Sequence, residues 1–292
     1  MPQRTGWDCA VIASRAWIRF APLSLGKWWL WTRVHEHYRD FTCRTIFGAK
    51  VTGNTKDLIQ RHLYYFGVWE PHITRMVVDL LRPGDVFVDV GANIGYYTLL
   101  ASRIVGPTGK VVAVEAAPWI HAVLERHVAL NGLGNVRTVN RAATDKTGTL
   151  SLYKADDSNV GSTSLIRKVG EAVEVEGAPL ATLLDDDEIA RVKLLKIDVE
   201  GAELQVLAGL TSLLPRMRPD AALLIEVQGA NAVVEGVFSL MRRHGFLAYQ
   251  LRNVYSPGVY MANEPRMSPV RISHPNGFNG DLLFTRVALD GT

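Results

Sequence analysis

Three acidic residues lie where apolar runs of the sequence end. Asp89 leads into the loop Gly91–Gly95, Glu115 closes a second run, and Asp198 closes a later one. The runs are short and rich in valine, leucine and isoleucine, which is typical of parallel strands covered by helices on both faces. Ligands of an open parallel sheet bind beyond the carboxyl ends of its strands. We therefore expect the three carboxylates to converge on one crevice.

The glycine loop indicates which ligand this crevice takes. Gly91 and Gly95 permit unusual φ angles and a close approach of the backbone, and Glu115 can accept two hydrogen bonds from a ribose diol. A dinucleotide fingerprint needs a second glycine that admits the pyrophosphate, and Asn93 occupies that position here. S-adenosylmethionine (SAM) has no pyrophosphate, and its amino-acid tail suits a carboxylate such as Asp89 beside loop amides. The loop favours SAM, and an NAD(P)-dependent oxidoreductase is the first alternative.

Strand-like and helix-like segments alternate from residue 85 onward. The expected strands are residues 86–90, 111–115, 136–139, 192–198 and 221–227, and the expected helices are residues 96–105, 118–131, 202–214 and 230–244. This alternation predicts an α/β layer fold with right-handed crossovers. Residues 146–180 are polar and rich in glycine and serine, so we expect an inserted hairpin and loop there.

Composition and charge narrow the function classes. The 292 residues carry a net charge of only +3, which does not favour a nucleic-acid partner. The two cysteines, Cys9 and Cys43, allow no disulfide framework and no paired-cysteine metal pattern, and we expect no metal. No apolar run reaches the length of a membrane span, and charged residues interrupt the N-terminal apolar runs. We therefore expect a cytoplasmic protein.

The first 80 residues differ in composition from the rest, so we predict an N-terminal extension of residues 1–80 and a main domain of residues 81–292. Residues 1–60 hold nine Lys or Arg against four Asp or Glu. Within them, residues 15–33 mix tryptophan with basic side chains, as interfacial segments on the inner face of a membrane do. The interpretation that we favour is that the aromatic side chains pack on the main domain, cover the acceptor pocket or bury a homodimer contact.

Residues 86–98 resemble the first motif of the FkbM-type SAM-dependent methyltransferases. Further matching segments are Tyr64–Pro71, Val112–Glu115, Leu195–Glu203 and Leu224–Val227. The resemblance covers about residues 60–245. It implies a class I (Rossmann-like) methyltransferase fold, with a mostly parallel seven-stranded sheet and helices on both faces. It also implies SAM as methyl donor and, as acceptor, a hydroxyl group of a sugar, a glycolipid or a secondary metabolite.

The resemblance further implies roles for individual residues. The residues expected to bind the cofactor are Glu70, Asp89, Gly91, Asn93, Gly95, Tyr97, Thr98, Glu115, Ala116, Ala143 and Asp145. Residues 89–98 would hold the methionine part of SAM, Glu115 the ribose, and residues 143–145 would lie near the adenine. Asp198, Glu200 and Glu226 would border the transfer site.

Two departures from the family pattern lie in this region. The family commonly has Glu-Pro after the second strand, whereas Glu115 is followed by two alanines before Pro118. The wall beside the adenine is therefore less clearly defined. Gln228 stands where the family often has histidine or asparagine, so a histidine base at this point is excluded.

Methyl transfer to a hydroxyl needs alignment and a base. The transfer is an in-line displacement, and a general base that takes the hydroxyl proton contributes about 10²–10⁴ in rate. Asp198 and Glu200 are two residues apart, so both point the same way if strand geometry persists. We hypothesise that one is the base and the other orients the acceptor. Alternatively, both cap the helix expected to start near Gly201.

Other interpretations stay open at this point. A methyltransferase acting on nitrogen or on nucleic acid is a second alternative, although the chain lacks the Asn-Pro-Pro-aromatic motif that holds a flipped base. A non-catalytic protein that retains the fold is a third. His274 and residues 162–164 are weaker candidates for acceptor contacts, and residues 185–188 are expected to form a solvated turn.

Overall fold

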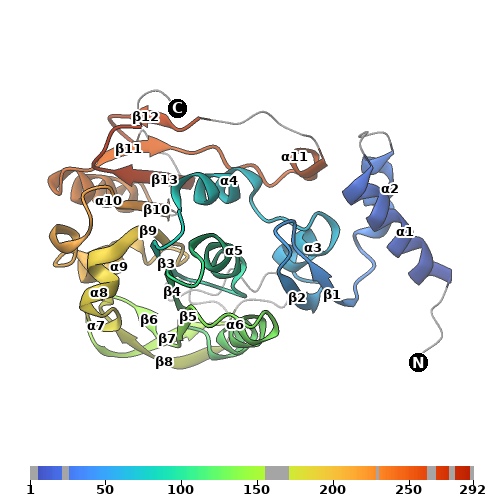
Figure 1. The fold of residues 1–292 in the computed structure, drawn as a ribbon, viewed down its shortest axis with the longest axis horizontal. Helices are drawn as coiled ribbons and strands as arrows, with labels where there is room; N and C mark the ends of the chain where they lie inside the picture. The colour runs from blue at the N-terminus through green and yellow to red at the C-terminus, as the bar shows by residue number, and fades with distance from the viewer. Residues whose placement is uncertain are drawn as a thin grey trace.

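The computed structural model describes residues 6–21, 26–154, 171–227, 230–261, 268–275 and 280–289. Its centre is a sheet with the strand order β12-β11-β13-β10-β9-β3-β4-β5 (Figure 1). In chain order the strands are β3 (Val86–Val90), β4 (Lys110–Val114), β5 (Val136–Val139), β9 (Val192–Ile197), β10 (Ala222–Val227), β11 (Leu247–Gln250), β12 (Val270–Ile272) and β13 (Gly280–Thr285).

The strand directions are those of the class I methyltransferase fold. Strands β5, β4, β3, β9 and β10 run parallel, and β13 is antiparallel to β10. β11 is antiparallel to β13, which restores the parallel direction. The sheet has one strand more than the expected seven, because the short β12 adds to the edge of β11.

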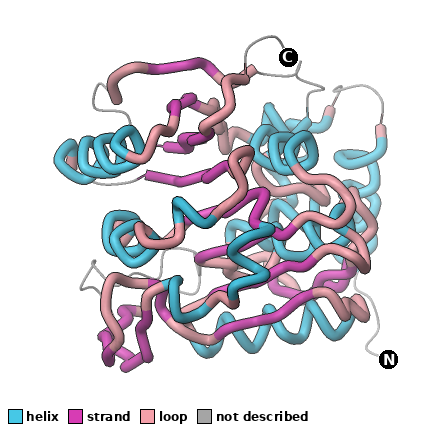
Figure 2. The backbone as a smooth tube through the Cα atoms, turned by 60° about the vertical axis from the view of Figure 1, so that its left-hand side comes forward, coloured by secondary structure: helices cyan, strands magenta, loops and turns pink. Residues whose placement is uncertain are grey.

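Helices cover both faces of the sheet. Along β3, Phe87 points into one hydrophobic cluster, and Val86, Val88 and Val90 point into the other. The first cluster includes α4 (Pro71–Leu80), α5 (Tyr96–Val105) and α6 (Pro118–Leu130). The second includes α7 (Leu180–Leu183), α8 (Asp186–Arg191), α9 (Glu203–Leu210) and α10 (Asn231–Arg243). Figure 2 shows the strands stacked between these helices.

Local signals explain where the helices begin and end. Gly95 precedes α5 with φ 90°, and Gly106 follows it with φ 65°, which are backbone angles that favour glycine. Pro118 occupies the first turn of α6, where its missing N–H leaves no bond unmade. The predicted helix over residues 202–214 is shorter than expected: α9 ends at Leu210, and the 3₁₀ turn η2 (Leu214–Arg216) follows.

The insertion forms a small second sheet. Strands β7 (Gly148–Tyr153) and β8 (Ala172–Ala178) pair antiparallel, and β6 (Ala142–Ala143) joins β8. The predicted hairpin is therefore confirmed for the described residues, and the acceptor candidates at 162–164 lie outside them. The solvated turn predicted at 185–188 is correct only in that Asp185, Asp186 and Asp187 are exposed, because the segment begins helix α8. Asp185 caps α8 in a capping box with Glu188, and Glu188 is buried against Lys110 and Arg137.

The N-terminal extension packs on the main domain. It contains α1 (Gly6–Phe20), α2 (Lys27–Val34), the hairpin β1 (Asp40–Arg44) and β2 (Lys50–Asn54), and α3 (Leu58–Tyr65). Composition did not indicate the hairpin. Val11, Ile18 and Trp31 are buried in the same hydrophobic cluster as Phe87. α1 and α2 lie at the opposite end of the molecule from α10 (Figure 1). A short helix, α11 (Pro257–Met261), contacts α2.

Candidate active site

The buried carboxylate of Asp89 stabilises the loop that follows β3. This carboxylate is fully buried and accepts a hydrogen bond of 2.6 Å from the Thr98 hydroxyl, at the start of α5. Burial raises the pKa of Asp89, although the charge of Lys196 and the Thr98 bond oppose the shift. Gly91 has φ 79°, and a Cβ there would overlap the carbonyl oxygen of Asp198. Glycine at this position thus lets the loop lie directly against the end of β9.

Glu115 organises the same loop from the end of β4. Its two oxygens accept the N–H groups of Asn93 (2.8 Å) and Ala117 (2.9 Å). Asn93 adopts φ 51°, a left-handed conformation that asparagine tolerates better than most residues. The Asn93 side chain in turn accepts the N–H of Ile94. Each oxygen of Glu115 keeps a further lone pair, so both can still accept from a diol.

We expect binding of the adenosine part of the ligand at Glu115 to strengthen as pH rises through neutrality. Burial raises the pKa of Glu115 to about 7, against the opposing effect of its two N–H bonds. Only the ionised carboxylate accepts two ribose hydroxyls without losing one oxygen to a proton. Affinity for S-adenosylhomocysteine should therefore increase about tenfold between pH 6 and pH 8, by calorimetry. The same titration of Glu115→Gln should show no such dependence.

The segment beside the predicted adenine site is tied to the ends of β4 and α9. Ala143 is buried, and Asp145 is exposed. Gly209 of α9 packs so closely on the carbonyl of Thr144 that a Cβ would overlap it. Asn140 donates to the carbonyls of Glu115 (2.8 Å) and Ala116 (3.1 Å). This amide holds the half-buried Ala116 in place, although sequence reasoning did not select it.

Asp198 forms an ion pair at the end of β9. Its Oδ2 lies 2.7 Å from the ammonium group of Lys196, whose side chain is 4% exposed. That ammonium also lies 4.8 Å from the centre of the Tyr97 ring, which is a cation–π contact. Burial lowers the pKa of Lys196, but the charges of Asp198, Glu70 and Asp89 outweigh it and raise the value above the usual range.

Glu70 closes the site from the N-terminal side. It precedes α4 with φ 43°, and its carboxylate is buried. Oε2 accepts from the Tyr97 hydroxyl at 2.6 Å, and Oε1 accepts from Asn253 and Tyr255, both at 2.8 Å. The Asn253 amide also donates to Asp281 at 2.9 Å. Two carboxylates thus fix this amide, and its buried Oδ1 has no partner among the described residues.

Glu70, Asp198, Glu226 and Asp281 together form what we call the acid cluster. Glu226 of β10 pairs in register with Asp281 of β13, so the two carboxyls come from adjacent antiparallel strands. The charge of Asp198, followed by burial, raises the pKa of Glu226. Burial, followed by the charge of Glu70, raises the pKa of Asp281. Glu226 and Asp281 therefore retain protons at a pH where free carboxyls have lost theirs.

The strand geometry that would align Glu200 with Asp198 does not persist. β9 ends at Ile197, and Glu200 has φ 52° in the turn that follows. The N-terminus of the next helix, α9, is also capped differently from the prediction. The residue before α9, Ala202, provides no side-chain cap, and Oε1 of Glu203 accepts the N–H of Gly201 at 2.8 Å. Asp198 is therefore the member of the pair that joins the acid cluster through Lys196.

Sequence reasoning missed the residues that the C-terminal part contributes. Asn253, Tyr255 and Asp281 lie outside any glycine-rich or signature motif, and Asp281 stands at the start of a strand that was not predicted. The short continuous apolar run Leu282–Phe284 was the available signal for that strand. His274, the predicted C-terminal candidate, is exposed.

Known proteins with similar sequences identify the family of this chain. The profile of the family described as "Methyltransferase FkbM domain" matches residues 89–248. This chain belongs to the FkbM methyltransferase family. The "31-O-demethyl-FK506 methyltransferase FkbM" of Streptomyces tacrolimicus is 33% identical over an alignment of 198 residues, and the match covers 57% of this chain and 74% of that protein. "Methyltransferase sdnD" of Sordaria araneosa is 33% identical over an alignment of 160 residues, and the match covers 44% of this chain and 61% of that protein.

A solved structure with the same family name was also found. The crystal structure of "Methyltransferase FkbM" from Methylobacillus flagellatus KT matches with a TM-score of 0.40 and 15% identity. The match covers 78% of this chain and 55% of that one.

The residues of this FkbM methyltransferase fit SAM, the methyl donor that its family uses. Glu115 is suited to hold the ribose, because both of its oxygens retain free lone pairs. Gly91 and Gly95 have no side chains, so the loop between them exposes backbone atoms at the carboxyl end of β3. SAM would supply an activated methyl group on a sulfonium. In the part of the chain that the structure describes, no three His, Cys, Asp or Glu side chains are grouped to hold a metal ion.

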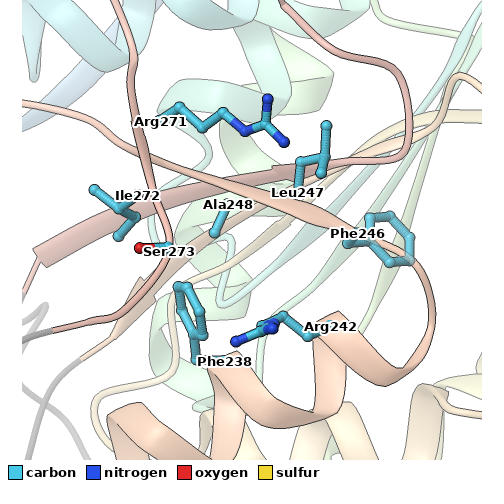
Figure 3. A pocket seen from close by; sticks show the side chains of 8 residues that line it. All are labelled: Phe238, Arg242, Phe246, Leu247, Ala248, Arg271, Ile272 and Ser273. Atoms are coloured by element: carbon cyan, nitrogen blue, oxygen red, sulfur yellow. The ribbon is translucent and has the colours of Figure 1, made fainter.

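A separate pocket of the FkbM methyltransferase lies away from the acid cluster. It has a volume of about 500 Å³ and lies between α10 and strands β11 and β12. Figure 3 shows Arg242 and Arg271 on opposite sides of it, with Phe238, Phe246 and Ile272 among the apolar lining residues. Among the described residues that line it there is no carboxylate or imidazole, so none of these side chains could accept a hydroxyl proton.

Proposed function

We propose that this FkbM methyltransferase transfers the methyl group of SAM to a hydroxyl oxygen of a sugar, a glycolipid or a secondary metabolite. The observation that carries the proposal is the open oxygen of Asp198. Oδ2 is held by Lys196, whereas Oδ1 has no hydrogen-bond partner within the described ranges. The side chain is 28% exposed, so a hydroxyl group can reach it.

The lining around Asp198 suits a polyhydroxylated acceptor. Glu226 and Asp281 hold protons more strongly than free carboxyls do, so they can donate hydrogen bonds as well as accept them. Tyr255 is 42% exposed, and its ring centre lies 5.4 Å from that of Trp69. These two aromatic side chains provide a flat apolar surface beside the polar groups.

In the proposed methyl transfer, Asp198, Lys196 and Tyr97 have different roles. Asp198 accepts the hydroxyl proton through Oδ1 as the oxygen forms its bond to the methyl carbon and the carbon–sulfur bond breaks. Lys196 holds the other oxygen of Asp198 in place and balances the charge of the neighbouring carboxylates. The ring of Tyr97 contacts the Lys196 ammonium group, and the Tyr97 hydroxyl donates a hydrogen bond to Glu70. Holding the reacting atoms in line contributes up to about 7–11 kcal/mol.

An oxygen acceptor is also supported by the relatives. The name of the Streptomyces tacrolimicus protein refers to an oxygen position of its substrate. The acid cluster is consistent with this chemistry, because a neutral hydroxyl needs a base. Amines that are neutral at the working pH need none to start the reaction. Identifying the methylated atom as oxygen or nitrogen therefore decides between this proposal and transfer to an amine.

The test of the donor class is calorimetric titration with S-adenosylhomocysteine, NAD and NADP. We expect micromolar binding of S-adenosylhomocysteine alone, and roughly 10- to 100-fold weaker binding by Glu115→Gln, because a hydrogen bond to a charged acceptor contributes about 1.5–3 kcal/mol. Glu125→Gln, an exposed change on α6, should bind normally. Binding of NAD(P) instead would contradict the donor assignment.

The acceptor class is tested with radiolabelled SAM and panels of glycosides, glycolipids and amines. Label that enters a hydroxyl compound as an alkali-stable ether supports transfer to oxygen. Label confined to the amines would contradict it.

A further inference from the structure

The first helix of the chain, α1, has an apolar outward face in addition to the apolar residues Val11 and Ile18 that it buries. Its outward face consists of Ile12, Ala13, Ala16, Trp17 and Phe20, a stripe at helical spacing. Trp17 is 50% exposed and Phe20 is 72% exposed. Surface helices of proteins in water normally show their charged side chains on this face.

The basic residues of the same helix point toward the protein instead. The Arg15 side chain donates to the carbonyl of Tyr64 at 2.6 Å, and its guanidinium lies 4.5 Å from the Tyr64 ring centre. The Arg19 guanidinium packs on Gly67, where a Cβ would come within 2.5 Å of it. The charges that would make α1 soluble are therefore used for internal contacts.

The second helix extends the apolar surface. Trp28 and Trp29 lie in its first turn and are 56% and 55% exposed, whereas Trp31 is buried. Trp17 and Phe20 lie in the last turns of α1, which contacts α2. The four exposed side chains thus come from the end of α1 and the start of α2, and we call them the hairpin tip. The Arg33 guanidinium lies 4.1 Å from the Trp29 ring centre.

We propose that the hairpin tip docks this enzyme on an anionic lipid bilayer. Tryptophan and phenylalanine beside an exposed cation, here Arg33, is the composition of interfacial membrane contacts, where rings enter the headgroup region and cations meet lipid phosphates. The nine basic and four acidic residues of positions 1–60 make this part of the chain positive, while the rest is negative. No helix of the described residues has the length and hydropathy to cross a bilayer, so the contact lies at the surface.

The same charge argues against a second copy of the chain as the occupant. A two-fold symmetric dimer through the hairpin tip would bring two positive N-terminal regions together. An anionic surface neutralises the positive charge of these regions.

The hairpin tip also lies near the proposed acceptor site. α2 contacts α11, and Tyr260 of α11 accepts the backbone N–H of Glu70 at 3.2 Å. Docking would therefore bring the acid cluster near acceptors presented on the bilayer.

The test is flotation of the full chain with vesicles of phosphatidylcholine, with and without phosphatidylglycerol. We expect binding to the vesicles with phosphatidylglycerol, weakened by salt, and about tenfold or greater loss for Trp28→Ser/Trp29→Ser. Ile46→Ser/Val287→Ser changes two exposed apolar residues elsewhere and should bind as the parent does. Unchanged binding of S-adenosylhomocysteine checks the fold of each variant and needs no acceptor.

Three results would overturn the proposal. They are absence of binding to both kinds of vesicle, equal binding by the tryptophan variant, and equal binding to phosphatidylcholine alone. A dimer in solution that dissociates in the tryptophan variant, without vesicle binding, would assign the surface to a second copy instead. None of these results depends on whether the enzyme methylates oxygen, so the docking and the chemistry are tested separately.

Discussion

Lys196→Met should lower the free energy of unfolding by about 3–5 kcal/mol, because it leaves buried carboxylates without the cation that pairs with them. The ammonium lies 2.7 Å from Asp198, and the charges of Asp198, Glu70 and Asp89 all raise its pKa. Methionine keeps most of the volume, so the loss reports charge rather than a cavity. Urea unfolding measured by circular dichroism gives the value.

The loss should depend on pH. Glu226 and Asp281 have pKa values raised above those of the unfolded chain, so their ionisation destabilises the folded state, and the penalty is relieved as pH falls through the folded values. Without Lys196 these pKa values rise further. The variant should therefore lose more stability at pH 8 than at pH 5.

Lys193→Met is the matched control for this change. Lys193 lies on the same strand and forms an ion pair of 3.0 Å with Asp220, whose side chain is 41% exposed. Its replacement should cost about 1 kcal/mol or less, since such pairs contribute little. Equal losses for the two lysines would mean that the acid cluster does not need Lys196.

Asp198→Asn should reduce kcat by about 10²–10⁴, because the hydroxyl of the acceptor loses its base. An amide cannot take the proton, whereas its oxygen can still accept a hydrogen bond from Lys196. Affinity for S-adenosylhomocysteine should stay within a few-fold of the parent. The measurement is steady-state methyl transfer to an acceptor found in the panels above.

Two further measurements make the assignment of the base specific. Glu200→Gln should retain most of the activity, since Glu200 lies in the turn beyond β9 and not on the strand. Asp198→Asn should also lower the pKa of Glu226, because the charge of Asp198 is the largest cause of its shift. Carboxyl carbon NMR of the free enzyme reads this pKa without any acceptor. Full activity in both variants would exclude both carboxylates as the base.

The sequence was sufficient for the central strands and helices. The predicted strand at 86–90 and helix at 96–105 agree with β3 and α5 residue by residue. Apolar periodicity and glycine stops act within a few residues, so they can be recognised without knowledge of the fold. The same holds for the glycine loop and Glu115, whose places at strand ends follow from the positions of those strands.

Tertiary structure alone decided the composition of the acid cluster. Glu226 meets Asp281 because β13 enters the sheet antiparallel between β10 and β11, and Asn253 then reaches both Asp281 and Glu70. Such pairings depend on strand order and register, which long-range packing sets and local pattern does not encode. The exposed apolar face of α1 has the same origin, since Arg15 turns inward to contact Tyr64, a residue 49 positions away in the chain. Local sequence thus determined the elements and the loop that we propose binds the methyl donor, whereas contacts between distant segments determined the proposed acceptor side and the exposed hairpin tip.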